Sequence, residues 1–399
     1  MLSTRTVILL AFAALPALSP RTLGVDVPNP SSEVLVRRVP DGGIQPEAAI
    51  DSRGVLHLLY FAGEPAGGDL FYVRSNDLGA TLSTPIRVNS QPGSAIATGT
   101  IRGGQLALGR NGRIHVAWNG SDRALPRGAI NPDLKKPGAP FLYARSTADG
   151  AGFESQRNLN LHVYSLDGGG SIAADAAGHV YAAWHGNKEG GPRGEDQRQV
   201  WLVRSQDDGA TFGEAGPAWD TPTGACGCCQ TRILATSSTS LALLYRSATN
   251  GTSRDIYVLS SSDNGRSFAG SRVQPWSINA CPMTSMSLAT AGGRVLAAWE
   301  TAGQVYWGVV DANGAVSAPA AAPGAGEARK HPRLAAASKS ESVLVWTERT
   351  GWARGGSIAW QVFDGTGRPS GPIGSAPSLP VWSFASAVAR PDGGFVVLY

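Results

Sequence analysis

The chain has 399 residues, of which 16% are charged and 42% are hydrophobic, and its formal net charge is +4. An average soluble domain has roughly 25% charged residues, so this chain has ample apolar material for a large core and is not a disordered protein. Its arginines are scattered, and no basic run is interleaved with aromatic residues, which argues against a nucleic acid as partner.

The N-terminus has the features of a secretory signal. Arg5 precedes an apolar run over residues 7–18, which is shorter than the about 20 residues that a membrane-spanning helix needs. Small residues occur at Ala17 and Ser19, and Pro20 leaves the cleavage position open. We expect a signal peptide over residues 1–19 and a secreted or periplasmic protein that does not span the membrane, with its cysteines in an oxidising compartment.

One strand-like pattern recurs along the rest of the chain. Each copy is rich in β-branched and aromatic residues and often begins at glycine, which is typical of a buried strand entered from a turn. The copies lie at residues 54–60, 112–118, 178–184, 240–246, 293–300, 342–348 and 393–399. A small-residue strand precedes each copy and a third strand follows most of them. Antiparallel units of about 50 to 65 residues predict a β-propeller with one unit per blade.

Four related turns follow the third strands, at residues 75–82, 146–153, 205–212 and 261–268. Their pattern is Ser-x-Asp-x-Gly-x-Thr-aromatic, in which Asp accepts backbone hydrogen bonds and Gly adopts positive φ. The pattern resembles the Asp box, or BNR repeat, of the sialidase superfamily, and the resemblance covers nearly all of the mature chain. In that superfamily these turns are structural and lie away from the active site, which implies a structural role for Asp77, Asp207 and Asp263.

The number of inner strand pairs sets the number of blades. Seven pairs predict seven four-stranded antiparallel blades in one all-β domain over residues 20–399, and six blades, as in sialidases, are the alternative. The last pair ends the chain and lacks an outer strand. We expect residues 33–39 to supply that strand and close the ring.

Residues just ahead of the innermost strands should converge, because these strands begin at one mouth of the central channel. This places two cysteine-containing stretches, residues 224–232 and 280–286, in adjacent blades at the same mouth. The candidate ligand-binding residues are Glu47, Arg102, Arg232, Arg246, Arg254, Arg333 and Trp352. Trp352 could stack on a sugar face or pack on a neighbouring blade.

The sialidase resemblance also implies a catalytic set, which this sequence matches only in part. The family has an arginine triad, an Asp acid and a Tyr–Glu nucleophile pair. Residues 44–46 read Ile-Gln-Pro, so the first family arginine is absent. Asp69 matches the position of the acid, and Glu300 with Tyr306 could imitate the Tyr–Glu pair. We therefore do not expect orthodox sialic-acid hydrolysis.

The four cysteines allow three interpretations. Disulfides are the first, with Cys226 or Cys229 joined to Cys281 across two blades, or a strained bridge between Cys228 and Cys229. A soft-metal site is the second, and copper is the possible cofactor. Its ligands would be Cys226, Cys228, Cys229, Cys281, Met283, Met286 and His331. Free or redox-active thiols are the third.

Three functions follow from these observations. The first is recognition, with or without hydrolysis, of a carbohydrate or other anionic ligand at the mouth by an exported sialidase-like propeller. The second is a non-enzymatic propeller that binds copper or acts in redox chemistry. The third is a structural interaction scaffold.

Overall fold

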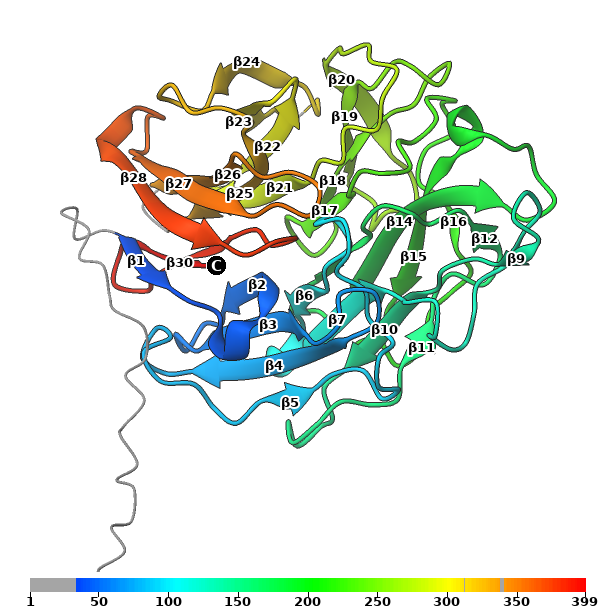
Figure 1. The fold of residues 1–399 in the computed structure, drawn as a ribbon, viewed down its shortest axis with the longest axis horizontal. Coiled ribbons are helices and arrows are strands. Elements are labelled where there is room, and N and C mark those ends of the chain that lie inside the picture. The colour runs from blue at the N-terminus through cyan, green and yellow to red at the C-terminus, as the bar shows by residue number, and fades with distance from the viewer. Residues whose placement is uncertain (1–33, 312, 338–340) are drawn as a thin grey trace, which may run out of the picture.

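The computed structural model describes residues 34–399 apart from 312 and 338–340, so the predicted signal peptide lies outside the described residues. Within the described part of the chain, seven β-sheets surround a central axis (Figure 1). The inner strands follow one another around the ring, from β2 through β6, β13, β17, β21 and β25 to β29, which again contacts β2. The prediction of a seven-bladed all-β propeller is confirmed.

Six blades have at least four antiparallel strands each. Blades one and two contain β2 (Ile44–Ile50), β3 (Leu56–Ala62), β4 (Asp69–Ser75) and β5 (Ile86–Arg87), then β6 (Gln105–Leu108), β7 (Ile114–Asn119), β10 (Phe141–Arg145) and β11 (Arg157–Asn158). Blade three contains β13 (Ser171–Ala174), β14 (Val180–Lys188), β15 (Gln199–Ser205), β16 (Gly216–Pro217) and the additional β12 (Val163–Tyr164). A separate hairpin joins β8 (Ile130–Asn131) to β9 (Lys136–Pro137).

The remaining blades follow the same order from the axis outward. Blade four contains β17 (Arg232–Ala235), β18 (Leu241–Arg246), β19 (Ile256–Ser261) and β20 (Ala269–Gln274). Blade five contains β21 (Met286–Ala291), β22 (Arg294–Thr301), β23 (Gln304–Val310) and β24 (Val316–Ala321). Blade six contains β25 (Lys330–Ala336), β26 (Ser342–Glu348), β27 (Gly356–Phe363) and β28 (Pro369–Leu379).

Blade seven closes the ring with strands from both ends of the described chain. It consists of β29 (Ser386–Ala389), β30 (Phe395–Leu398) and β1 (Val34–Arg37), and β1 pairs with β30 in parallel. The prediction that residues 33–39 supply the missing strand is confirmed, although this blade has three strands rather than four. Pairing of β1 covers an edge of β30 that would otherwise be open to other chains.

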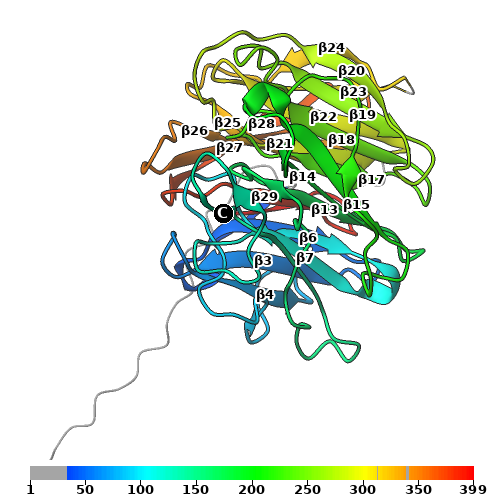
Figure 2. The same ribbon diagram turned by 90° about the vertical axis from the view of Figure 1, so that its right-hand side faces the viewer.

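Hydrophobic layers between neighbouring blades form the core. The second strand of each blade is packed on both faces, which explains why these strands are almost continuously apolar. Trp118, Trp184, Trp299 and Trp346 lie in four of these strands and are at most 1% exposed. Figure 2 shows the ring from the side, with blade five above and blade one below.

Three of the four Ser-x-Asp turns share one hydrogen-bond pattern. In the turn after β15, the Ser205 hydroxyl donates to Asp207 Oδ1 at 2.7 Å, and the Thr211 amide donates to the same oxygen at 2.8 Å. The turns at Asp77 and Asp263 repeat both contacts. Each carboxylate binds its own turn, at the end of the blades opposite the mouth. Among the described residues, no helix is long and apolar enough to cross a membrane.

Candidate functional site

The centre of the channel holds a charged cluster contributed by four blades. Glu47 on β2 pairs through Oε1 with Arg232 Nη2 on β17 at 2.7 Å, and through Oε2 with Arg333 Nη2 on β25 at 2.7 Å. Arg232 also donates to the side chain of Gln105 on β6. Burial opposes ionisation of Glu47, but the charges and hydrogen bonds of both arginines outweigh it and hold the pKa of Glu47 below its usual range. Glu47 is therefore a carboxylate at neutral pH.

A second charged group lies between blades four and five. Arg246, at the end of β18, donates to the backbone carbonyl of Glu300, and its Nη1 donates to the Arg254 carbonyl at 2.7 Å. The Arg246 guanidinium also lies 4.9 Å from the centroid of the Trp276 ring. The Gly303 amide donates to Glu300 Oε1 at 2.5 Å. Burial is the largest influence on Glu300 and raises its pKa.

The three predicted catalytic side chains do not meet in the structure. Tyr306 is opposite Trp299 in the β22–β23 hairpin, whereas Glu300 is opposite Val305. Because side chains alternate between the faces of a sheet, Glu300 and Tyr306 project from opposite faces of blade five. Asp69, in blade one, accepts hydrogen bonds from Asn89 Nδ2 at 2.6 Å and from the Gly93 amide at 2.7 Å.

Aromatic and cationic side chains gather at the mouth. A Cβ atom placed on Gly99 would lie 3.2 Å from Met283 Cε, 3.4 Å from Trp352 Cζ3 and 3.9 Å from Arg102 Nη1. Trp352 is 63% exposed and forms an edge-on contact with Trp382, with 6.2 Å between ring centroids. These side chains come from loops after blades one, four and six and from within blade six. The loops are far apart in sequence but come together around Gly99.

Arg102, at the mouth, keeps some of its N–H donors free of protein contacts. Arg102 Nε donates to the Asp167 carbonyl at 2.5 Å, and Nη1 donates to the Thr98 carbonyl at 3.2 Å. A guanidinium has five N–H donors, so these contacts do not exhaust it. Arg254 pairs through Nη2 with Glu195 at 2.6 Å.

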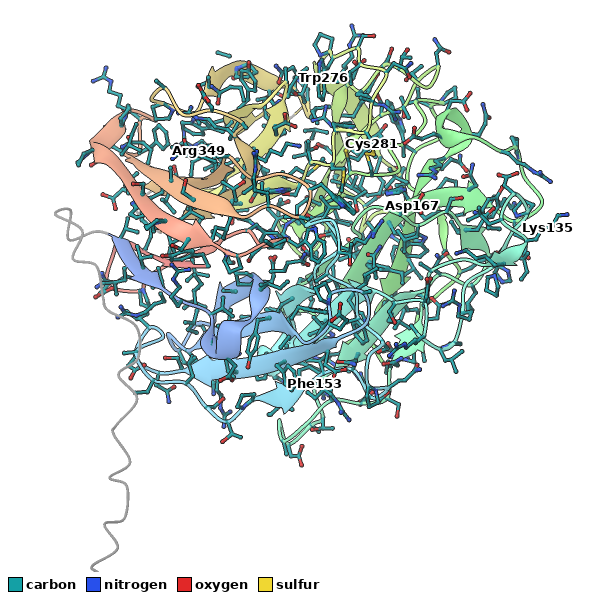
Figure 3. The ribbon with its side chains drawn as sticks, viewed as in Figure 1. Lys135, Phe153, Asp167, Trp276, Cys281 and Arg349 are labelled. Atoms are coloured by element: carbon teal, nitrogen blue, oxygen red, sulfur yellow. A yellow bond between two sulfur atoms is a disulfide. The ribbon has the colours of Figure 1, made fainter. Side chains whose placement is uncertain are left out.

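The cysteine stretches form one sulfur cluster between blades four and five. Cys228 and Cys281 form a disulfide, and Cys281 lies at the surface (Figure 3). Cys226 and Cys229 are buried thiols with sulfurs 3.1 Å apart, and Cys226 Sγ is 3.6 Å from Cys228 Sγ. The predicted disulfide between the two blades is present, but Cys228 provides it rather than Cys226 or Cys229. The reason is that Cys228 points toward the 275–285 loop while its neighbours point into the protein.

The two thiols differ in acidity. Burial raises the pKa of Cys229, but the hydrogen bond from Cys226, the charge of Arg246 and the Thr284 hydroxyl outweigh it and lower that pKa to about 6. The pKa of Cys226 is raised, because its proton is held by Cys229 and because it is buried. Cys229 is therefore the more acidic of the two thiols.

The other predicted soft ligands lie elsewhere. Met283 is beside Gly99 at the mouth, and Met286 packs in the hydrophobic core between blades four and five. The Nδ1 atom of His331 lies 3.1 Å from the Ser285 hydroxyl. Burial lowers the pKa of His331 to about 3.

Sequence reasoning missed two residues of this region. Gln105 begins the inner strand β6, so the rule used for the other mouth residues could have found it. His185 is buried beside the Cys229 carbonyl, where burial lowers its pKa to about 3. His185 occupies the position after Trp184 in a repeated strand, and nothing in that repeat distinguishes it.

A separate hollow of about 810 Å³ lies at the outer edge of the ring, beside β16. Leu161, Trp201 and Pro217 line it. It is remote from the inner strands and contains none of the predicted site residues.

Comparisons with solved structures identify similar propellers. A Hadza microbial sialidase aligns with a TM-score of 0.50 and 15% identity over 77% of this chain and 64% of that chain. The chain has a sialidase-type propeller fold. The NanB sialidase from Streptococcus pneumoniae aligns with a TM-score of 0.49 and 10% identity over 78% of this chain and 66% of that one. An ulvan lyase of polysaccharide lyase family PL25 aligns with a TM-score of 0.49 and 13% identity over 87% of each chain.

This sialidase-type propeller is similar to those proteins in fold. It spans less than two thirds of the length of the two sialidases. No family model matches the chain, and no curated protein matches it. The similarity expected from the turn motifs is therefore confirmed for the fold.

Proposed function

We propose that this chain is an exported propeller that binds an acidic saccharide at the mouth of its channel. The observation that carries the proposal is the position of Trp352, which is 63% exposed at the convergence of several blade loops. An exposed indole provides a flat apolar surface for the C–H face of a sugar ring and a polar N–H at its edge. Trp382 supports this surface edge-on.

Cationic groups beside the aromatic surface favour an acidic ligand. Arg102 and Trp352 both lie beside Gly99. The side chain of Arg232 is 17% exposed at the centre of the channel. Guanidinium groups bind carboxylates and sulfates through paired hydrogen bonds. The similarity to a solved sialidase supports a carbohydrate as the ligand.

A glycan array with the full chain tests the proposal, followed by calorimetric titration of the glycans that bind. We expect acidic glycans to bind and Trp352→Ala to lower their affinity about tenfold or more, since lost stacking of about 1.4 kcal/mol is a factor of ten. Leu161→Ala is the matched control, because Leu161 is 56% exposed but lies in the separate outer hollow. Equal loss in both variants, or no binding of acidic glycans, contradicts the proposal.

Hydrolysis of the bound saccharide is the second candidate function. Glycosidases use two carboxyl groups as acid and base, and Glu47 and Glu300 are buried carboxyl groups of this region, with the pKa of Glu300 raised by burial. A panel of chromogenic glycosides with wild type and Glu300→Gln tests it. Turnover that Glu300→Gln abolishes supports hydrolysis, and a wild type without turnover leaves recognition as the function.

A further inference from the structure

The four cysteine sulfurs form a single cluster although they come from two blades. Three of them precede β17, where Cys226, Cys228 and Cys229 have sulfurs within 4.8 Å of one another. The fourth, on Cys281, is bonded to Cys228. All four cysteines of the chain therefore meet at one place.

The surroundings of the cluster suit negatively charged sulfur. Cys226 and Cys229 are 1% and 2% exposed, so water has little access to them. The charges of Arg246 and Arg254 act on these thiols from neighbouring positions. The Thr284 hydroxyl donates to Cys229 Sγ at 3.5 Å. These cationic and hydrogen-bonding groups would stabilise the negative charge of thiolate ligands.

We propose that the reduced chain binds one thiophilic d¹⁰ cation, Cu(I) or Zn(II), through Cys226, Cys228, Cys229 and Cys281. Four sulfurs at about 2.3 Å from a single ion, arranged as a tetrahedron, lie about 3.8 Å from each other. The separations of 3.1 Å between Cys226 and Cys229 and 3.6 Å between Cys226 and Cys228 need to grow by less than 1 Å. Thiolate ligands select these two ions over magnesium, calcium and manganese.

Binding requires the Cys228–Cys281 bond to open first. A dithiol or phosphine reductant supplies two electrons and is itself oxidised, and the two sulfurs take up two protons to become thiols. The cation then replaces the thiol protons, which are released to solvent. The disulfide and the metal are thus alternative states of the same four sulfurs. The exposed position of Cys281 makes this bond accessible to a reductant.

Metal retention by the full chain tests the proposal. The chain is reduced with a phosphine under anaerobic conditions, loaded in separate arms with Cu(I) or Zn(II), and passed through gel filtration with a competing chelator. We expect about one ion per reduced chain, little in the oxidised chain, and X-ray absorption showing sulfur neighbours at about 2.3 Å. Retention in one arm identifies the ion. Failure of the reduced chain to retain either ion overturns the proposal.

Variants test the ligand set. Loss of one of four thiolates from a thiolate site should weaken binding by about a hundredfold, so we expect this for both Cys229→Ser and Cys281→Ser. Cys281 is exposed and its bond to Cys228 is already open in the reduced chain, so its replacement should leave the fold of the reduced chain unchanged, as circular dichroism should confirm. Met283→Leu is the matched control, because it removes a nearby sulfur outside the cluster and should retain the ion. Wild-type affinity in Cys281→Ser and Cys229→Ser would show that the ion binds elsewhere.

Discussion

Glu47→Gln removes the negative charge that Arg232 and Arg333 share at the centre of the channel. The change keeps the size and shape of the side chain, so it opens almost no cavity. One amide oxygen remains to accept a hydrogen bond, but the amide nitrogen faces a guanidinium. Arg333, whose side chain is 5% exposed, is then left with an uncompensated charge.

The expected loss of stability is large, because an isolated buried charge has little access to water. Removal of one partner from a buried ion pair costs about 3–5 kcal/mol, and we expect this for Glu47→Gln at pH 7. The less buried Arg232 should contribute little of it, since its side chain is 17% exposed and also binds Gln105. Urea unfolding followed by tryptophan fluorescence measures the difference.

The loss should depend on pH in a defined direction. The pKa of Glu47 is below its ordinary value of 4.5 in the folded chain, so its contribution is complete above pH 4.5 and disappears as the pH falls through the folded value. Wild type and Glu47→Gln should therefore converge in acid. Glu64→Gln, at an exposed position in the same blade, is the control and should change stability by less than about 0.5 kcal/mol. A Glu47→Gln effect below about 1 kcal/mol, or one that is constant between pH 7 and pH 3, would refute the reasoning.

Three other predictions concern the scaffold. Asp207→Ala should cost about 1 kcal/mol in urea unfolding through its lost turn hydrogen bonds. Because the hydrogen bonds from Thr211 outweigh burial and lower the pKa of Asp207 to about 2, the wild-type advantage should vanish only as the pH falls toward 2. Burial lowers the pKa of His115 on β7 to about 4, so the wild type should lose roughly 1.4 kcal/mol of stability per pH unit as the pH falls from 6.5 to 4. His115→Gln should remove this part of the loss. An unchanged dependence of stability on pH in the variant contradicts this. Deleting residues 1–39 removes β1 and exposes β30, so size-exclusion chromatography should show association, whereas a stable monomer would show that closure by β1 is dispensable.

The ring architecture could be predicted because each blade repeats the same physical pattern. The apolar second strands and the turns after the third strands recur at regular spacing, and a repeated signal is visible even where single copies are weak. The role of residues 33–39 followed from the missing outer strand of the last pair. The three-stranded form of blade seven could not be predicted, because a strand count from sequence does not reveal how far an edge extends.

The residues of the site were easier to predict than the ion pairs and the disulfide that they form with one another. Glu47, Arg232 and Arg333 were all expected at the mouth, but their ion pairs cross the channel, and distances across a ring depend on its curvature. The cysteine pairing depended on side-chain directions in an irregular loop. No periodicity governs such a loop, so the sequence favoured Cys226 or Cys229 as the partner of Cys281, whereas the structure pairs Cys228 with Cys281 and leaves the other two as thiols.

The sulfur cluster and the saccharide site share the loop over residues 275–285. Cys281 belongs to the cluster, and Met283, two residues later, lies next to Gly99 in the group that surrounds Trp352. An ion held by four sulfurs requires Cys228 and Cys281 to move from bonding distance to about 3.8 Å apart, which is more than 1 Å of displacement. Close-packed neighbours transmit a shift of this size, so Met283 should move relative to Trp352 when the state of the cluster changes. We therefore expect the affinity for an acidic saccharide to differ between the oxidised chain and the reduced, metal-loaded chain, and calorimetric titration of both forms checks this.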